Sequence, residues 1–64
     1  MKFQIRIKDR MGDKPASELF DDIHKANEAY EAVRQEVRDT WAEPDVDAVY
    51  MIVYWSHGGS ARIK

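Results

Sequence analysis

The chain has 64 residues, with 10 lysines and arginines against 12 aspartates and glutamates, and a formal net charge of −2. A chain of this length is expected to form one domain, over residues 1–64, that buries only about 60% of its unfolded surface. The absence of cysteine excludes disulfides and thiolate zinc sites, and the acidic balance gives no whole-molecule attraction to nucleic acid.

Apolar and polar residues alternate at the start of the chain, with Phe3, Ile5 and Ile7 at the apolar positions. A period of two predicts a strand with one buried face. Residues 9–13 then carry turn chemistry, because Gly12 can adopt a positive φ and aspartates bond to nearby backbone. The start has no continuous apolar run of the kind found in a signal peptide or membrane anchor. We therefore expect a soluble, cytoplasmic protein with no membrane contact.

Residues 14–20 fit two structures, a short edge strand that returns from the turn or an early start to a helix. Pro15 suits both, since proline is tolerated at a sheet edge and at the first helical position. A helix from residue 15 to residue 42 would be about 40 Å long, which is awkward in so small a domain. We favour the edge strand.

A helix is predicted next, capped by Asp21 or Asp22 and ended by Pro44, which disfavours helical geometry at the residue before it. Its apolar residues recur at steps of three and four and so form one stripe. The stripe consists of Ile23, Ala26, Tyr30, Val33, Val37 and Trp41. We expect the stripe to face the core, with Trp41 as an anchor.

Residues 48–55 hold the densest β-branched and aromatic material and are predicted to form the central strand. Both of its faces are apolar, because successive side chains alternate between them. Ala48, Tyr50, Ile52 and Tyr54 point one way, and Val49, Met51, Val53 and Trp55 point the other. A single helix covers only one of these faces, so the other should meet water, a second copy or a partner.

Gly58 and Gly59 predict a two-residue hairpin turn into a short last strand over residues 60–64. This turn pairs Trp55 with Arg62, and paired residues share a face. Ala61 and Ile63 are then expected beneath the helix, on the side of the tyrosines. The expected exposed surface has Val49, Met51, Val53 and Trp55 at its centre, with Arg62 and Lys64 at its rim. A shift of one residue in the turn would invert the two faces.

These elements predict an α+β fold with one amphipathic helix packed on a small, mainly antiparallel sheet. The expected order is strand, short strand, helix, strand, strand. His57 and Ser60 flank the last turn, but the sequence offers no orienting carboxylate near them for nucleophilic catalysis. Glu43, Asp45 and Asp47 lack the glycine and the terminal glutamate of an EF-hand loop. We expect no enzymatic activity, no metal and no cofactor.

An apolar centre with a polar rim is the usual anatomy of a protein-binding site. The leading hypothesis is a non-enzymatic protein–protein interaction module that binds another protein through the exposed face, which could equally be covered by a second copy in a homodimer. The alternative is single-stranded nucleic-acid binding, with bases stacked on aromatic rings and phosphates held by cations. The residues of this alternative site are Lys2, Arg6, Lys8, Trp55, Arg62 and Lys64.

The whole chain, being tiny, cysteine-free and acidic with one helix on a small sheet, resembles small phage-encoded inhibitors, anti-CRISPR proteins among them. The resemblance is one of size and architecture. It implies a non-catalytic binder that occupies the surface of a host protein, and it assigns no site residues.

Overall fold

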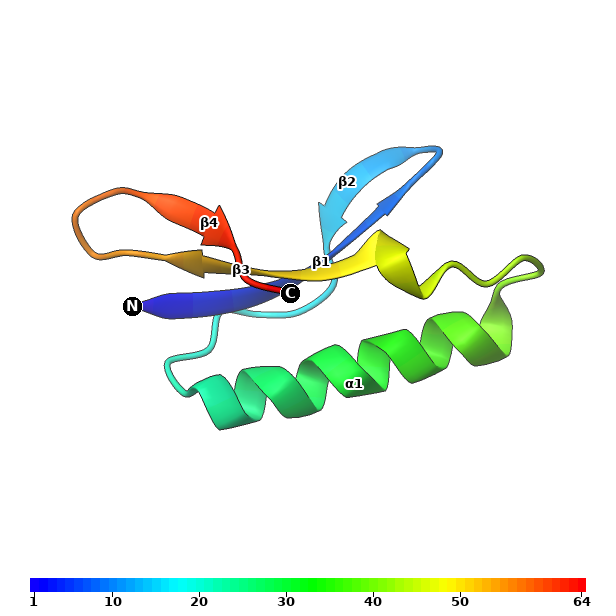
Figure 1. The fold of residues 1–64 in the computed structure, drawn as a ribbon, viewed down its shortest axis with the longest axis horizontal. Helices are drawn as coiled ribbons and strands as arrows, with labels where there is room; N and C mark the ends of the chain where they lie inside the picture. Colours follow the sequence, from blue (N-terminus) through cyan, green and yellow to red (C-terminus); the bar gives the residue numbers. More distant parts are fainter.

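The computed structural model describes the backbone of residues 1–64 and every side chain except that of Val46. The elements are β1 (Lys2–Asp9), β2 (Gly12–Pro15), α1 (Ile23–Thr40), the 3₁₀ helix η1 (Val46–Ala48), β3 (Val49–Tyr54) and β4 (Ser60–Arg62). The strands form a four-stranded antiparallel sheet in the order β2-β1-β3-β4, and α1 lies along one face of it (Figure 1). The predicted α+β class is confirmed.

Helix α1 begins where the Asp22 carboxylate accepts a hydrogen bond from the backbone N–H of His24 at 2.8 Å. It ends at Thr40, before Pro44 is reached, because Trp41 adopts an extended backbone conformation. The predicted stripe faces the sheet. Ala26, Tyr30 and Val37 are buried, and Ile23, Val33 and Trp41 are half-buried against the core. In the part of the chain described, no helix is both long and apolar enough to cross a membrane.

The segment over residues 14–20 is an edge strand only at its start, because β2 ends at Pro15. The chain then follows the edge of β1 without regular pairing. The N–H of Ala16 donates to the carbonyl of Ile5 at 2.8 Å, and Phe3 and Phe20 exchange two backbone hydrogen bonds of 2.8 Å. The edge-strand interpretation is confirmed for the first part, and the alternative of an early helix is wrong.

The hairpin between β3 and β4 has a longer loop than predicted, because Tyr54 pairs with Ser60. The N–H of Trp55 donates to the carbonyl of Gly59 at 2.9 Å, and the N–H of Gly58 donates to the carbonyl of Trp55 at 3.1 Å. Of the two loop glycines only Gly58 has a positive φ, 99°. This is the pattern of a three-residue loop in which a type I turn precedes a left-handed residue. The predicted two-residue turn is wrong.

The longer loop inverts the two faces of β3, since an odd change in register turns every side chain to the other side. Val49, Met51 and Val53 pair with the apolar residues of β1 on the helix side. They are 1%, 0% and 5% exposed, so their predicted exposure is wrong. Tyr50 and Tyr54, expected beneath the helix, lie on the opposite face.

Polar side chains cover the face of the sheet opposite α1. The Tyr50 hydroxyl donates to Oδ2 of Asp13, and Arg6 Nε donates to Oδ1 of the same carboxylate at 2.8 Å. The guanidinium of Arg62 lies 5.1 Å from the centroid of the Tyr50 ring. Tyr50 is only 9% exposed as a result, and the β1–β2 hairpin is held to the central strand by side-chain bonds.

Candidate functional site

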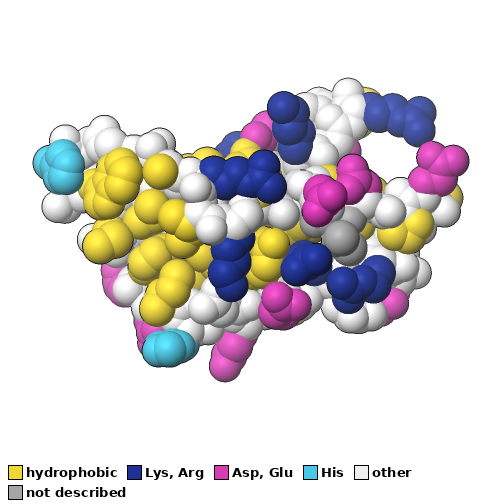
Figure 2. Space-filling view, in the orientation of Figure 1, with side chains coloured by type: hydrophobic (Ala, Val, Ile, Leu, Met, Phe, Trp, Pro, Cys, Tyr) yellow, Lys and Arg dark blue, Asp and Glu magenta, His cyan; other side chains and the backbone are white. Residues whose placement is uncertain are grey.

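Large apolar side chains are exposed where the β3–β4 hairpin extends past the start of α1 (Figure 1). Trp55, Ile63 and Met1 are 38%, 45% and 65% exposed, and Phe3 and Ala61 are half-buried. We refer to these five residues as the hairpin-end patch. Figure 2 shows apolar side chains gathered at this end of the molecule, with lysine and arginine side chains beside them. A contiguous exposed apolar surface of this kind marks an interaction site more often than a scattered apolar residue does.

The strand register brings the hairpin-end patch together. Phe3 pairs with Val53, and Val53 pairs with Ala61, which makes one row across three strands. Trp55 lies two residues beyond Val53 and therefore on the same side of the sheet. This side faces α1 in the middle of the molecule. Trp55 is exposed because the β3–β4 hairpin extends past the start of α1 (Figure 1), and Ile63 is exposed because it lies at the outer edge of the sheet, where its N–H bonds to the carbonyl of Met51.

The ring of Trp55 is held in place by its own hairpin. A Cβ atom at Gly59 would lie 2.6 Å from Cε3 of Trp55, so the ring rests directly on the glycine backbone. The His57 ring lies nearly parallel to it, with centroids 6.2 Å apart and an interplanar angle of 12°. Such support lowers the entropy that an anchoring side chain would lose on binding.

Two cations border the hairpin-end patch. Lys64 Nζ donates to Oδ1 of Asn27 at 2.7 Å and lies 5.2 Å from the centroid of the Tyr30 ring. Arg62 covers Tyr50 on the other side of β4. Among the described residues neither Arg62 nor Lys64 is ion-paired with a carboxylate. Arg62 Nε also donates to the backbone oxygen of Lys64 at 2.7 Å, so both cations have polar neighbours, but no acidic side chain that the structure describes balances their charge.

The predicted protein-binding residues divide into two groups. Trp55, Arg62 and Lys64 are at the surface, as expected, whereas Val49, Met51 and Val53 belong to the core. Ala61 and Ile63 do lie on the helix side, as predicted, but α1 does not cover Ile63. Met1 was assigned no role by the sequence analysis. The only available signal for Met1 is the pairing of Lys2 with Tyr54, because extending that register by one residue places Met1 beside Trp55.

The residues expected to bind nucleic acid do not share one surface. Strand alternation places Lys2, Arg6, Lys8 and Arg62 on the face opposite Trp55. Lys2 is ion-paired with Asp21, and Arg6 is ion-paired with Asp13. Two aromatic rings lie on the cationic face: that of Tyr50 is covered by Arg62, and that of Tyr54 is half-buried, with its hydroxyl donating to Oε1 of Gln4 at 3.2 Å. The structure thus separates the exposed ring from most of the cations.

The Asp13 group of side chains is electrostatically stable. Hydrogen bonds from Tyr50 and Arg6 lower the pKa of the Asp13 carboxyl below its usual value, and the bond to Asp13 raises the pKa of Arg6. Burial raises the pKa of the Tyr50 phenol, and the bond to Asp13 adds to the rise. The carboxylate stays ionised and the phenol stays protonated near neutral pH. These groups hold strands together and present no reactive proton.

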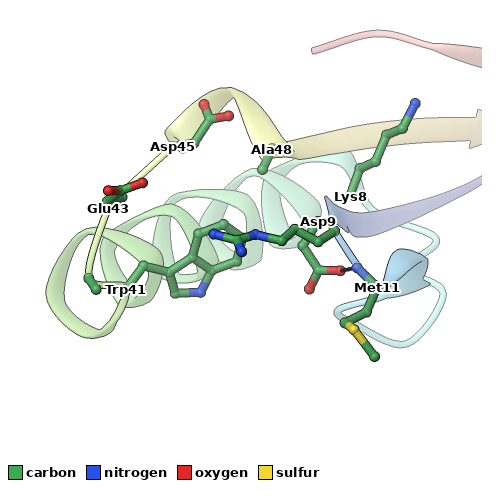
Figure 3. A pocket seen from close by; sticks show the side chains of 9 residues that line it. Lys8, Asp9, Met11, Trp41, Glu43, Asp45 and Ala48 are labelled. Atoms are coloured by element: carbon green, nitrogen blue, oxygen red, sulfur yellow. Dashed lines mark hydrogen bonds between the residues drawn. The ribbon is translucent and has the colours of Figure 1, made fainter.

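A pocket lies between the β1–β2 hairpin and the end of α1, away from the hairpin-end patch (Figure 3). Its lining includes Lys8, Asp9, Met11, Trp41, Glu43 and Asp45. Asp9 is already engaged, since its carboxylate accepts a bond from the N–H of Met11 at 2.8 Å. The lining mixes both signs of charge and favours no single kind of ligand. No group of three histidine, cysteine or acidic side chains is arranged to hold a metal within the described residues.

His57 and Ser60, which the sequence analysis did not favour as a catalytic pair, lie in the hairpin loop and at the start of β4. The His57 ring stacks on Trp55, and no hydrogen bond joins it to Ser60 among the described side chains. Of the features above, the hairpin-end patch gathers the most exposed large apolar side chains, and its Trp55 ring rests on the backbone of Gly59. Comparison of the chain with protein-family models, with curated proteins and with solved structures found no match.

Proposed function

We propose that this chain is a non-enzymatic protein-interaction module that binds another protein through the hairpin-end patch. The observation that carries the proposal is the position of Trp55, exposed in an apolar row and supported by the backbone of Gly59. Tryptophan is enriched among the residues that dominate binding energy, particularly where neighbouring contacts exclude water.

The surroundings of the hairpin-end patch support the same role. An apolar centre bordered by charged residues has the anatomy of a protein interface, and here Arg62 and Lys64 form part of that border. A small domain also gains stability when a partner covers exposed apolar surface. Action by occupancy, as in the phage-encoded inhibitors that the chain resembles in size and plan, requires only such a surface.

The test compares two variants in which one exposed apolar side chain is shortened. Tagged wild-type protein, Trp55→Ala and Met11→Ala are used to capture partners from a lysate of the organism that encodes the chain. Met11 is the matched control, because it is 92% exposed and lies in the β1–β2 turn, away from the hairpin-end patch. Truncating an interface anchor costs about 2 kcal/mol or more, so we expect the partner to be lost with Trp55→Ala and retained with Met11→Ala.

Circular dichroism establishes that both variants are folded before capture is compared. The proposal fails if folded Trp55→Ala retains the same partners, at the same affinity, as the wild type and Met11→Ala.

A further inference from the structure

The outer edge of β4 has free backbone groups. β4 is the last strand in the sheet order, and Figure 1 shows no strand on its outer side. Gly59 and Ile63 bond toward β3, through a carbonyl at 2.9 Å and an N–H at 3.0 Å respectively. Backbone groups of an antiparallel strand alternate in direction. The N–H and C=O groups of Ser60 and Arg62 therefore point outward, where an added strand could bond to them.

A strand added to this edge would meet two different surfaces. Its side chains on the helix side would lie beside Ala61 and Ile63, close to Trp55. Its side chains on the other side would lie beside the exposed Arg62. Because side chains alternate along a strand, the added segment needs an apolar residue at every second position.

The charge of Arg62 determines which residues suit the other alternate positions of the added segment, whose side chains lie on the side opposite α1. Arg62 is exposed on the side opposite α1, and no acidic side chain is ion-paired with it among the residues the structure describes. A second copy of the chain at this edge would bring another Arg62 against it, and like charges on adjacent strands are destabilising. Aspartate and glutamate side chains supply the complementary charge.

We propose that the edge of β4 binds an extended segment of a partner protein in which apolar residues alternate with acidic ones. Such strand addition takes affinity from backbone hydrogen bonds and specificity from alternate side chains. The inference rests on the proposed function, because the hairpin-end patch forms the apolar half of the site. Beyond that function, the inference specifies strand addition as the binding mode and states the chemistry of the segment that is bound.

The probe is a peptide of about eight residues, within the usual length of a strand, in which isoleucine alternates with glutamate. The control peptide has lysine in place of each glutamate. Since the chain has a formal net charge of −2, long-range attraction favours the lysine peptide, and only local recognition at Arg62 reverses that order. We expect the glutamate peptide to bind about tenfold more tightly and to shift the amide NMR signals of Ser60 and Arg62.

A backbone variant tests strand addition itself. Ser60→Pro removes an outward N–H at a sheet edge, where proline is tolerated. Ser60→Ala is its matched control, because it keeps the N–H and removes only the hydroxyl. We expect Ser60→Pro to bind the glutamate peptide about tenfold more weakly and Ser60→Ala to bind like the wild type. If Ser60→Pro does not fold, Arg62→Glu takes its place and should reverse the preference between the two peptides.

Equal binding of the two peptides, preference for the lysine peptide, or binding of neither would overturn the inference. So would self-association through this edge, seen by light scattering as a dimer that Ser60→Pro abolishes. If Trp55→Ala still loses its captured partner in any of these cases, the interaction module stands and only strand addition falls. Retained capture by Trp55→Ala removes the proposed function instead.

Discussion

The two faces of the sheet are shielded from water by different kinds of contact. On the helix side, Ile5 and Met51 are fully buried beneath α1, and contacts between apolar side chains exclude the water. On the opposite side, Tyr50 is almost as well buried, but the groups that cover it are Arg62 and the bonded pair of Arg6 and Asp13. One strand, β3, supplies side chains to both arrangements.

The contrast explains where the molecule is left exposed. A tyrosine has an apolar ring and a hydroxyl that can bond to a neighbour, so the far face is closed by side chains of the sheet itself. Aliphatic side chains have no such bond and need an apolar cover along their whole length. Trp55 remains uncovered beyond the start of α1, and Ile63 remains uncovered at the outer edge of the sheet. The candidate binding surface is thus the part of the helix-side face that lacks a helix.

The largest effect is expected from the helix side. Met51 is 0% exposed, so Met51→Ala should lower the free energy of unfolding by about 2 to 5 kcal/mol through lost burial and a residual cavity. Its neighbour Ile52, half-buried on the opposite face, is the control, and Ile52→Ala should cost clearly less. Urea denaturation measures both. Equal losses would mean that the two faces are packed equally tightly, contrary to the comparison.

A smaller loss is expected at the uncovered end of the same face. A Cβ atom at residue 59 would lie 2.6 Å from the Trp55 ring, so Gly59→Ala should cost about 1 to 3 kcal/mol by forcing the ring aside. In a Trp55→Ala background most of that cost should disappear. A double-mutant cycle on the unfolding free energy measures the coupling, and purely additive effects would show that the ring does not rest on Gly59.

The polar face should respond to loss of a single hydroxyl. Tyr50→Phe removes the bond to Asp13, and we expect the unfolding free energy to fall by about 1 kcal/mol at neutral pH. The pKa of Tyr50 is raised above 10.0 in the folded protein, so the unfolded chain releases this proton first. Wild-type stability should therefore decline as the pH rises from 10.0 toward the folded-state pKa. An identical decline in Tyr50→Phe would exclude Tyr50 as its source.

A comparable effect of about 1 kcal/mol is expected at the start of the helix that covers the apolar face. Asp22→Ala removes the cap on the N–H of His24 and should cost about 1 kcal/mol. The adjacent Asp21→Ala is the matched control, because it breaks only an exposed ion pair with Lys2, and such pairs contribute little. Thermal unfolding of the two variants compares them. A larger loss in Asp21→Ala would show that the surface pair, and not the cap, holds the start of α1.

Only Trp55 of the hairpin-end patch was anticipated, together with the two bordering cations, whereas Phe3, Ala61 and Ile63 were expected in the core. Trp55, Arg62 and Lys64 were expected at the surface because of their place near the last turn, and they are there. Val49, Met51 and Val53 were assigned to the same surface by a turn that pairs Trp55 with Arg62. The loop actually closes with Trp55 bonded to Gly59, and this change moves those three residues into the core.

The sequence by itself determined the elements, because each depends on local periodicity. The period of two in β1, the stripe of α1 and the cap at Asp22 are properties of adjacent residues, and the structure confirms them. The tertiary structure alone decided which face of β3 meets the helix, since both faces are apolar and their hydrophobic pattern cannot choose between them. It also decided how the sheet is placed along α1, with the β3–β4 hairpin lying beyond the start of the helix. That placement left Trp55 exposed, and local patterns fix where α1 begins but not how the sheet is aligned with it.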